Sequence, residues 1–189
     1  MDEEKGDAEE FDLRITFNKD KLYSSDCIRR LAQNLIIDIL EIRSFKHGML
    51  KKMKVDSFFL ELTKACKMLF INEIDKITAE SIHIVYKEMV EVSTKLHKLS
   101  TSIPDGKCVE FLKLIGIIFD NGKFFSNGDI EVYEWKDDLQ YCIFDGFVEI
   151  YIIQSFPCWY LTILRHENRE SLESAKNRES LEKVEVSPE

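Results

Sequence analysis

The chain has 189 residues, 44% of them hydrophobic, so it can bury one core and is short for two full domains. Its formal net charge of -9 argues against nucleic-acid binding, because phosphate recognition requires a clustered surface of lysine and arginine. No apolar run reaches the roughly 18 residues that a membrane-spanning helix needs. We therefore expect a single soluble domain.

The acidic residues are concentrated toward the two ends of the chain. Residues 1–10 contain six acids and one lysine, which is unlike a signal or transit peptide. We expect residues 1–10 to form an acidic disordered tail, residues 11–166 a single domain, and residues 167–189 a charged, disordered tail. The last segment holds a nine-residue duplication that places Leu172 and Leu181 on opposite faces of any helix, which favours disorder over packing.

Five cysteines, an odd number without a CxxC pair, lie in apolar surroundings. This pattern suits buried thiols in a reducing compartment better than a disulfide framework. We expect a nuclear and cytoplasmic protein. The pair Ser187-Pro188 fits a kinase site, although such dipeptides are common by chance.

Hydrophobic periodicity predicts one strand followed by three helices. Apolar and polar residues alternate over residues 11–17, as in a half-buried strand. Apolar residues at helical spacing then predict three helices, over residues 24–45, 56–70 and 78–99. Thr78 is the expected N-cap of the third helix, and Ile77 and Ile82 are spaced as a hydrophobic staple.

Beyond Pro104 the pattern predicts strands separated by tight turns. The strands are expected over residues of about 109–119, 129–135, 140–144, 147–154 and 158–164. Asn-Gly pairs at 121–122 and 127–128 and the Asp-Gly pair at 145–146 supply the positive φ that hairpin turns require. The element order predicts an α+β fold in which three helices pack on one face of a mainly antiparallel sheet.

The last predicted strand is expected to lock the fold. Trp159, Leu161 and Ile163 alternate with more polar neighbours, so one face of the strand brings three large apolar side chains to the core. Pro157 precedes this run, where no hydrogen bond of the sheet is lost. We expect this segment to pair along the sheet in a single, closed conformation.

No arrangement of residues in the sequence indicates a catalytic, cofactor or metal site. The four histidines are not spaced with other ligands as in zinc sites, and the seven glycines form neither GxGxxG nor a Walker loop. We expect no metal and no cofactor. A small cytosolic enzyme with a site near Asp137, Asp138 and His97 stays open as an alternative. The basic segment 46–54 is interpreted as a solvated linker, with an acidic partner or phosphate as the alternative.

Apolar residues outside the main stripe of the third predicted helix indicate recognition. Tyr86, Val90 and His97 follow one another at spacings of four and seven, and we hypothesise that they form a partner-binding ridge on one flank of the helix. The alternative is that this helix runs through the middle of the domain, between the sheet and the other two helices, which would bury its wide apolar arc.

The order of segments resembles the HORMA family of spindle-checkpoint proteins, in particular its Comet-type adaptors. The resemblance is carried by "ITFNKDKLYSSDCIRRLAQNLIIDIL", "SIHIVYKEMVEVSTKLHKL" and "FLKLIGIIFDNGKFFSNGDIEVYEW", and it covers residues 11–164. It implies a HORMA-like fold in which the segment with Trp159, Leu161 and Ile163 takes the place of the C-terminal belt.

The resemblance also implies a function. A Comet-type protein is a non-enzymatic adaptor that binds a closed HORMA checkpoint protein of the Mad-two type. It presents that protein to an AAA+ remodelling ATPase, so that the checkpoint complex is disassembled. A peptide-capturing HORMA protein of another type is the alternative within the family, and the small cytosolic enzyme is the alternative outside it.

Overall fold

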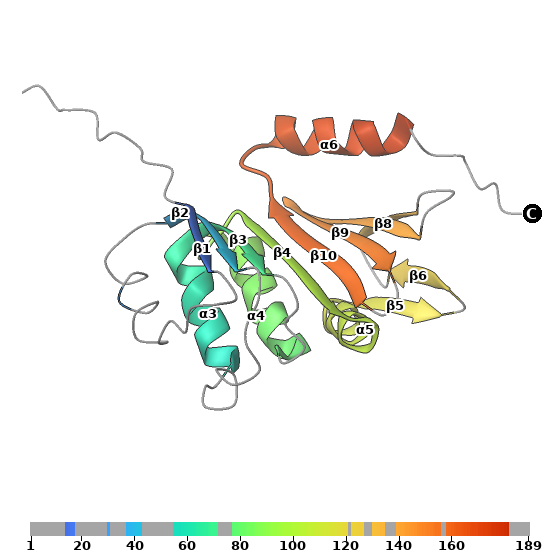
Figure 1. Ribbon diagram of the computed structural model, residues 1–189. Helices are drawn as coiled ribbons and strands as arrows, with labels where there is room; N and C mark the ends of the chain where they lie inside the picture. Colours follow the sequence, from blue (N-terminus) through green and yellow to red (C-terminus); the bar gives the residue numbers. More distant parts are fainter. Residues whose placement is uncertain are drawn as a thin grey trace, which may run out of the picture.

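An eight-stranded sheet forms the middle layer of the structure, and helices lie on both of its faces (Figure 1). The computed structural model describes residues 14–17, 30, 37–42, 55–71, 77–120, 122–126, 130–134, 139–155 and 158–181. The strands are β1 Arg14–Phe17, β2 Ile37–Ile42, β3 Cys66–Ile71, β4 Lys98–Pro104, β5 Ile117–Asp120, β6 Lys123–Ser126, β7 Glu131–Glu134, β8 Gln140–Asp145, β9 Val148–Ser155 and β10 Cys158–Arg165. The helices with described bounds are α3 Val55–Ala65, α4 Ala79–Val90, α5 Asp105–Leu114 and α6 Arg169–Leu181.

The main sheet joins a parallel half to an antiparallel half. Its strand order is β1-β2-β3-β4-β10-β9-β8-β7. Strands β1 to β4 run parallel to one another, whereas β4, β10, β9, β8 and β7 are antiparallel neighbours. Strands β5 and β6 pair with each other in a small second sheet. The α+β class is as predicted, but the sheet is mixed rather than mainly antiparallel.

Strands β2 and β3 and the start of β4 lie in segments that were predicted as helices. Residues 37–42, placed in the first predicted helix, form β2, and the second predicted helix ends at Ala65 and continues as β3. The helix predicted over 78–99 ends at Val90, and Leu99 belongs to β4. The second and third predicted helices are confirmed over 56–65 and 79–90. The predictions are wrong over the strand residues, because each strand is a short apolar run, which periodicity alone does not distinguish from a buried helix.

The strand predicted over 109–119 is also wrong, because its first half belongs to α5 and only its end belongs to β5. Cys108, Phe111 and Leu112 are buried, and their spacing of three and four residues is that of a helix face. Gly116, just beyond the helix, has a φ of 86°. This left-handed conformation commonly ends helices and favours glycine.

The two hairpins and the last strand lie where they were predicted. Strands β5 and β6 are joined at Gly122, which has a φ of 79°, and strands β8 and β9 at Gly146, with a φ of 58°. Strand β10 lies between β4 and β9 and is antiparallel to both. The predicted turn at 127–128 lies outside the described residues, and β1 covers the end of the strand predicted over 11–17.

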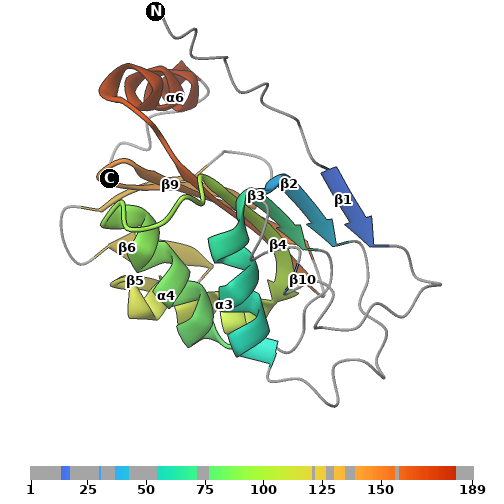
Figure 2. The same ribbon diagram turned by 90° about the vertical axis from the view of Figure 1, so that its left-hand side faces the viewer.

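Helices α3, α4 and α5 lie on one face of the sheet and α6 lies on the other (Figure 1), and Figure 2 shows α3 and α4 on the side away from α6. Helices α3, α4 and α5 enclose the main core, which contains Phe59, Phe111 and Ile163. Ile77 and Ile82, the predicted staple of α4, are both buried in it. Among the described helices, none combines the length and the hydrophobicity that a membrane crossing requires.

Helix α6 forms a second, smaller core on the opposite face. Its Leu172 and Ala175 are buried against Cys142 and Phe144 of β8. The prediction of a disordered tail from residue 167 is therefore wrong for α6, and so is the prediction that all helices share one face. The prediction of disorder compared Leu172 with Leu181, nine residues later. The buried face of α6 is instead completed by Ala175, about one helical turn after Leu172.

Hydrogen bonds to Asp56 connect α3 to the start of α4. Its Oδ1 accepts hydrogen bonds from the amide of Thr78 (2.9 Å), the hydroxyl of Thr78 (3.0 Å) and the hydroxyl of Ser81 (2.7 Å). Thr78 is the N-cap of α4, as predicted, and its hydroxyl accepts from the amide of Ser81. Burial alone raises the pKa of Asp56, but these hydrogen bonds and nearby Lys107 together lower it below its ordinary value. Folding therefore favours the carboxylate form.

Replacing Asp56 by asparagine is expected to lower the free energy of unfolding by about 1 kcal/mol at neutral pH, because a neutral amide oxygen accepts weaker hydrogen bonds. Since the pKa is lowered on folding, this difference is complete above the ordinary pKa of 3.8 and disappears as the pH falls through the folded-state pKa. Urea unfolding over a pH series measures it. The control is Glu110→Gln, at an exposed carboxylate of α5, and an Asp56→Asn effect that persists in acid would contradict the prediction.

Replacing Leu172 by alanine is expected to lower the free energy of unfolding by about 2 kcal/mol, because it removes most of the apolar contact between α6 and β8. Its exposed neighbour provides the control: Glu173→Ala should change stability by no more than about 0.5 kcal/mol. Both are measured by urea unfolding. Equal stability of the two variants would show that α6 is not packed on the sheet in solution.

Candidate functional site

One half of the sheet face that carries α6 is not covered by any helix of the described residues (Figure 1). Helix α6 packs on β8, with partly buried tyrosines of β7 and β9 beside it. The strands next to this region, β3, β4 and β10, leave side chains of this face partly exposed. We call five of them the open face: Met68, Phe70, Ser100, Tyr160 and Thr162.

The open face combines apolar, aromatic and hydroxyl groups in register. Phe70, Ser100 and Thr162 are paired across β3, β4 and β10, so they form one row. The hydroxyls of Ser100 and Thr162 are 3.0 Å apart, and the Lys98 ammonium lies 5.3 Å from the centre of the Phe70 ring. Tyr160 is the most exposed member, at 53%. This surface is suited to contact with another polypeptide rather than to chemistry.

The parallel strands make this exposure unusual. Strands in parallel sheets generally have both faces covered, whereas antiparallel strands often have one face in water. Here α3 and α4 cover one face of β2, β3 and β4, and no described element covers the other. The exposed half of the sheet is therefore the half for which a covering layer is expected.

A cavity of about 640 Å³ adjoins the open face at the start of α6. Lys67, His97 and Arg165 line it on one side, and Ser171 and Ser174 of α6 on the other. Lys67 is paired with Asp38 at 2.9 Å, and the guanidinium of Arg165 donates to the carbonyl of Thr94 at 2.9 Å. The basic groups are thus held in place by the fold.

The surroundings of His97 lower its pKa below the ordinary value. Burial lowers its pKa, nearby Arg165 and Lys67 lower it further, and Glu167 opposes them with its Oε1 3.8 Å from Nδ1. The backbone of His97 is fixed by two hydrogen bonds: its amide donates to the carbonyl of Lys67, and its carbonyl accepts from the amide of Arg165. His97 therefore joins the starts of β3 and β4 to the end of β10.

The predicted ridge of Tyr86, Val90 and His97 does not exist as one surface. Tyr86 is only 5% exposed, donates a hydrogen bond from its hydroxyl to Asp145, and packs edge-on against Phe111. Burial, followed by the contact with Asp145, raises the pKa of Tyr86. Val90 is the exposed last residue of α4, and His97 lies beyond the helix, before β4. The prediction that the three residues share one flank of a helix is wrong, because α4 ends at Val90. Contact of these residues with a partner stays a prediction.

The predicted belt-like strand has the expected geometry. Trp159, Leu161 and Ile163 are buried, whereas Tyr160 and Thr162 point to the open face. The alternation of residues along this strand in the sequence indicates both faces, but only the buried residues were predicted to have a role. Sequence reasoning missed Phe70 because its segment was taken as a helix.

The remaining groups that could take part in chemistry either lie outside the described residues or are buried thiols. Asp137, Asp138 and the basic segment 46–54 lie outside them. Within the described ranges, no group of three or more histidine, cysteine or acidic residues is arranged to hold a metal ion. Burial raises the pKa of Cys66 to about 12 and also raises that of Cys108, so both thiols stay protonated.

Comparison with protein-family models, curated proteins and solved structures finds no match to this chain. The HORMA resemblance depended on a helix through residues 37–42 and a strand through 109–114, which form β2 and part of α5 instead. The surfaces of the protein itself are therefore the basis for a functional proposal.

Replacing Tyr86 by aspartate is expected to lower the free energy of unfolding by about 3 kcal/mol or more, because it places a carboxylate in the main core beside Asp145. Val90→Lys, at an exposed position, should change stability by no more than about 0.5 kcal/mol. Thermal and urea unfolding separate the two. Normal stability of the Tyr86→Asp protein would contradict the burial of Tyr86 and support the predicted ridge.

Proposed function

We propose that the protein is an adaptor that binds another protein through the open face. One observation carries this proposal: among the described residues, the parallel half of the sheet has helices on one face only. A binding partner would supply the missing layer. The proposal needs no catalytic group, which agrees with the expectation of a non-enzymatic protein.

The dimensions of the open face favour a helix of the partner. Neighbouring strands lie about 4.8 Å apart, so positions two strands apart are separated by about 10 Å. Packed helices lie 8–10 Å apart. A second helix beside α6 would therefore lie over β10 with β4 next to it, where Tyr160, Thr162 and Ser100 are placed. An amphipathic helix of the partner satisfies this spacing.

Tyr160 is the expected centre of the contact. Exposed tyrosines are enriched at interfaces because the ring supplies a large rigid area and the hydroxyl retains a polar contact. Lys98 borders the open face beside Phe70, so an acidic side chain at that end of the partner helix would be favoured. A standard interface buries about 800 Å² per partner, so we expect the partner to contact α6 as well as the five side chains of the open face.

The partner class implied by the HORMA resemblance is a narrower form of this proposal. It names a closed checkpoint protein of the Mad-two type and an AAA+ remodelling ATPase. Because the observed element order differs from the one that the resemblance uses, the Mad-two type protein enters as the first candidate to test and not as a premise.

Site-specific photocrosslinking tests the adaptor proposal. A photoreactive phenylalanine derivative is placed at Tyr160 or, as a matched control, at Phe125, which is exposed to nearly the same degree (53% and 51%). We expect a discrete partner to be captured at position 160 and not at 125. With that partner purified, Tyr160→Lys should weaken binding at least tenfold, the effect of losing a central interface residue, whereas Phe125→Lys should leave binding unchanged.

Three results would contradict the proposal or its narrower form. The same set of proteins captured at both positions would show non-specific contact. Capture of a second copy of this chain, with a dimer in light scattering, would make the open face a self-association surface. Failure of a purified closed Mad-two type protein to bind, while another partner is captured at position 160, would reject only the checkpoint form.

A further inference from the structure

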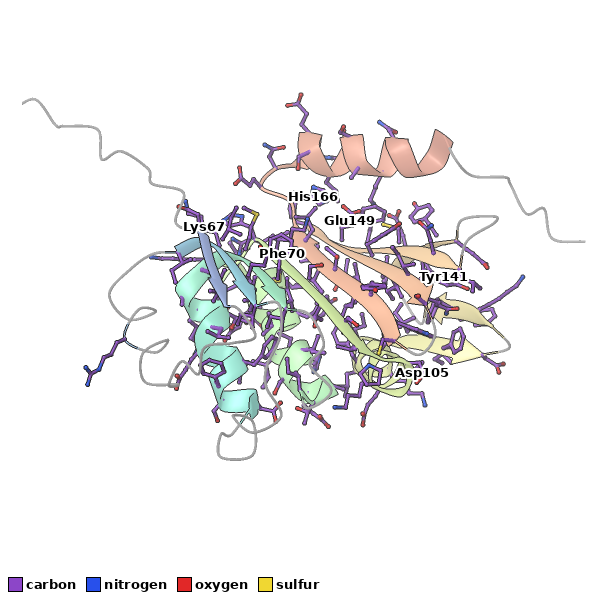
Figure 3. All side chains as sticks on the ribbon, in the orientation of Figure 1. Lys67, Phe70, Asp105, Tyr141, Glu149 and His166 are labelled. Carbon is purple, nitrogen blue, oxygen red and sulfur yellow. The ribbon has the colours of Figure 1, made fainter. Side chains whose placement is uncertain are left out.

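Three side chains form a continuous hydrogen-bond chain in the wall of the cavity at the start of α6. Figure 3 shows two of them, Glu149 of β9 and His166 after β10, below this helix. The Oε2 atom of Glu149 is 2.7 Å from Nε2 of His166, and Nδ1 of His166 is 2.9 Å from the hydroxyl oxygen of Ser171. His166 and Ser171 both line the cavity.

The polarity of this chain is set by the carboxylate. Because Glu149 accepts a hydrogen bond from Nε2, the neutral imidazole carries its proton there and leaves Nδ1 to accept from the hydroxyl of Ser171. Nucleophile, base and orienting carboxylate are therefore connected in the order that activates a serine. The relation is recognised by geometry, since the roles recur on unrelated folds.

Backbone contacts hold the two ends of this arrangement. The amide of Ser171 donates to the side chain of Asn168 at 2.9 Å, and the amide of His166 donates to the carbonyl of Phe147 at 2.8 Å. Glu149 is further held by the thiol of Cys142, which donates to its other oxygen at 3.4 Å. The hydroxyl of Ser171 is thus directed by its own helix turn toward a base that is itself fixed.

Attachment of α6 does not by itself account for these groups. Leu172 and Ala175 already bury the helix against β8. The side chains of His166 and Glu149 are 7% and 14% exposed, and a buried carboxylate-imidazole pair adds little stability because its desolvation offsets the attraction. Nor does attachment require that the serine face a cavity, whose volume is in the range of small-molecule sites.

We propose that Ser171, His166 and Glu149 form an acyl-transfer site that hydrolyses small carboxylic esters bound in this cavity. Ser171 is the nucleophile and His166 the general base, whereas Glu149 is a positioning residue. This activity is independent of the adaptor proposal and contrary to the expectation of a non-enzymatic protein. Ser171 belongs to the first turn of α6, the end at which the helix dipole favours negative charge.

The reaction has two balanced steps. The oxygen of Ser171 bonds to the ester carbonyl carbon while its proton passes to Nδ1 of His166. The bond from that carbon to the alcohol oxygen then breaks, and His166 returns the proton to the departing alcohol. Water next attacks the acyl-serine, gives a proton to His166, and releases the carboxylic acid as the proton returns to Ser171. Glu149 accepts the hydrogen bond from Nε2 and stabilises the imidazolium in both steps.

A fluorophosphonate probe tests the proposal on the full chain. The Ser171 oxygen displaces fluoride from phosphorus, and His166 takes the serine proton. We expect the intact mass to rise by one probe group and peptide mapping to place the label on Ser171. Ser171→Ala should abolish labelling, whereas Ser57→Ala, which removes an exposed serine of α3 outside the cavity, should leave its rate unchanged.

The base and the positioning residue give separate signatures. His166→Gln should slow labelling by about 100-fold, the lower end of general-base effects. Glu149→Gln should slow it by about tenfold and move the pH at which the labelling rate is half-maximal, a shift that a merely structural contact would not produce. Melting temperatures of the variants, measured in parallel, separate a loss of reactivity from a loss of fold.

Mapping on the unsubstituted protein decides the outcome even where a variant fails to fold. A label on any residue other than Ser171, or no label above that on heat-unfolded protein, would overturn the proposal. So would labelling of Ser171 with a rate that does not depend on His166. Release of nitrophenolate from p-nitrophenyl acetate, lost in Ser171→Ala and retained in Ser57→Ala, would extend the result from reactivity to turnover.

Discussion

The pairing of β10 with two neighbours is the constraint on which the rest of the structure depends. This strand lies antiparallel between β4, the last strand of the parallel half, and β9, the first of the antiparallel half. Its Trp159, Leu161 and Ile163 enter the main core, and its end positions Arg165 and His166 at the cavity. Without β10, neither the open face nor the hydrogen-bond chain under α6 would exist.

Local chemistry decided which parts of the fold could be predicted. The glycine turns, the Thr78 cap and the alternation along β10 each depend on a few adjacent residues, and all three were found. Strands β2 and β3 were missed because their identity depends on partners far along the chain rather than on their own pattern. The prediction of a strand in place of the second half of α5 followed from the same ambiguity of short apolar runs.

The candidate sites were harder to predict than the fold. Tyr160 could have been found, because alternation along the last strand places it opposite Trp159. The chain from Glu149 to Ser171 could not, since no spacing motif links a glutamate in β9 to a histidine seventeen residues later. Only the fold brings them together. The comparison of Leu172 with Leu181 led to the wrong prediction of a disordered tail, because a small alanine, Ala175, was sufficient to complete the buried stripe of α6.

The position of β10 has a consequence for synthesis of the protein. In the sequence, β10 follows every other strand of the main sheet, yet in space it lies between the two halves. The ribosome therefore releases β1 to β4 and β7 to β9 before the strand that connects them. Until β10 is made, each half of the sheet has an unpaired edge strand, which can pair with the wrong segment. The main sheet therefore cannot close until residues 158–165 have been synthesised, and the pairing of β10 with β4 joins segments far apart in the chain, a kind of contact that slows folding.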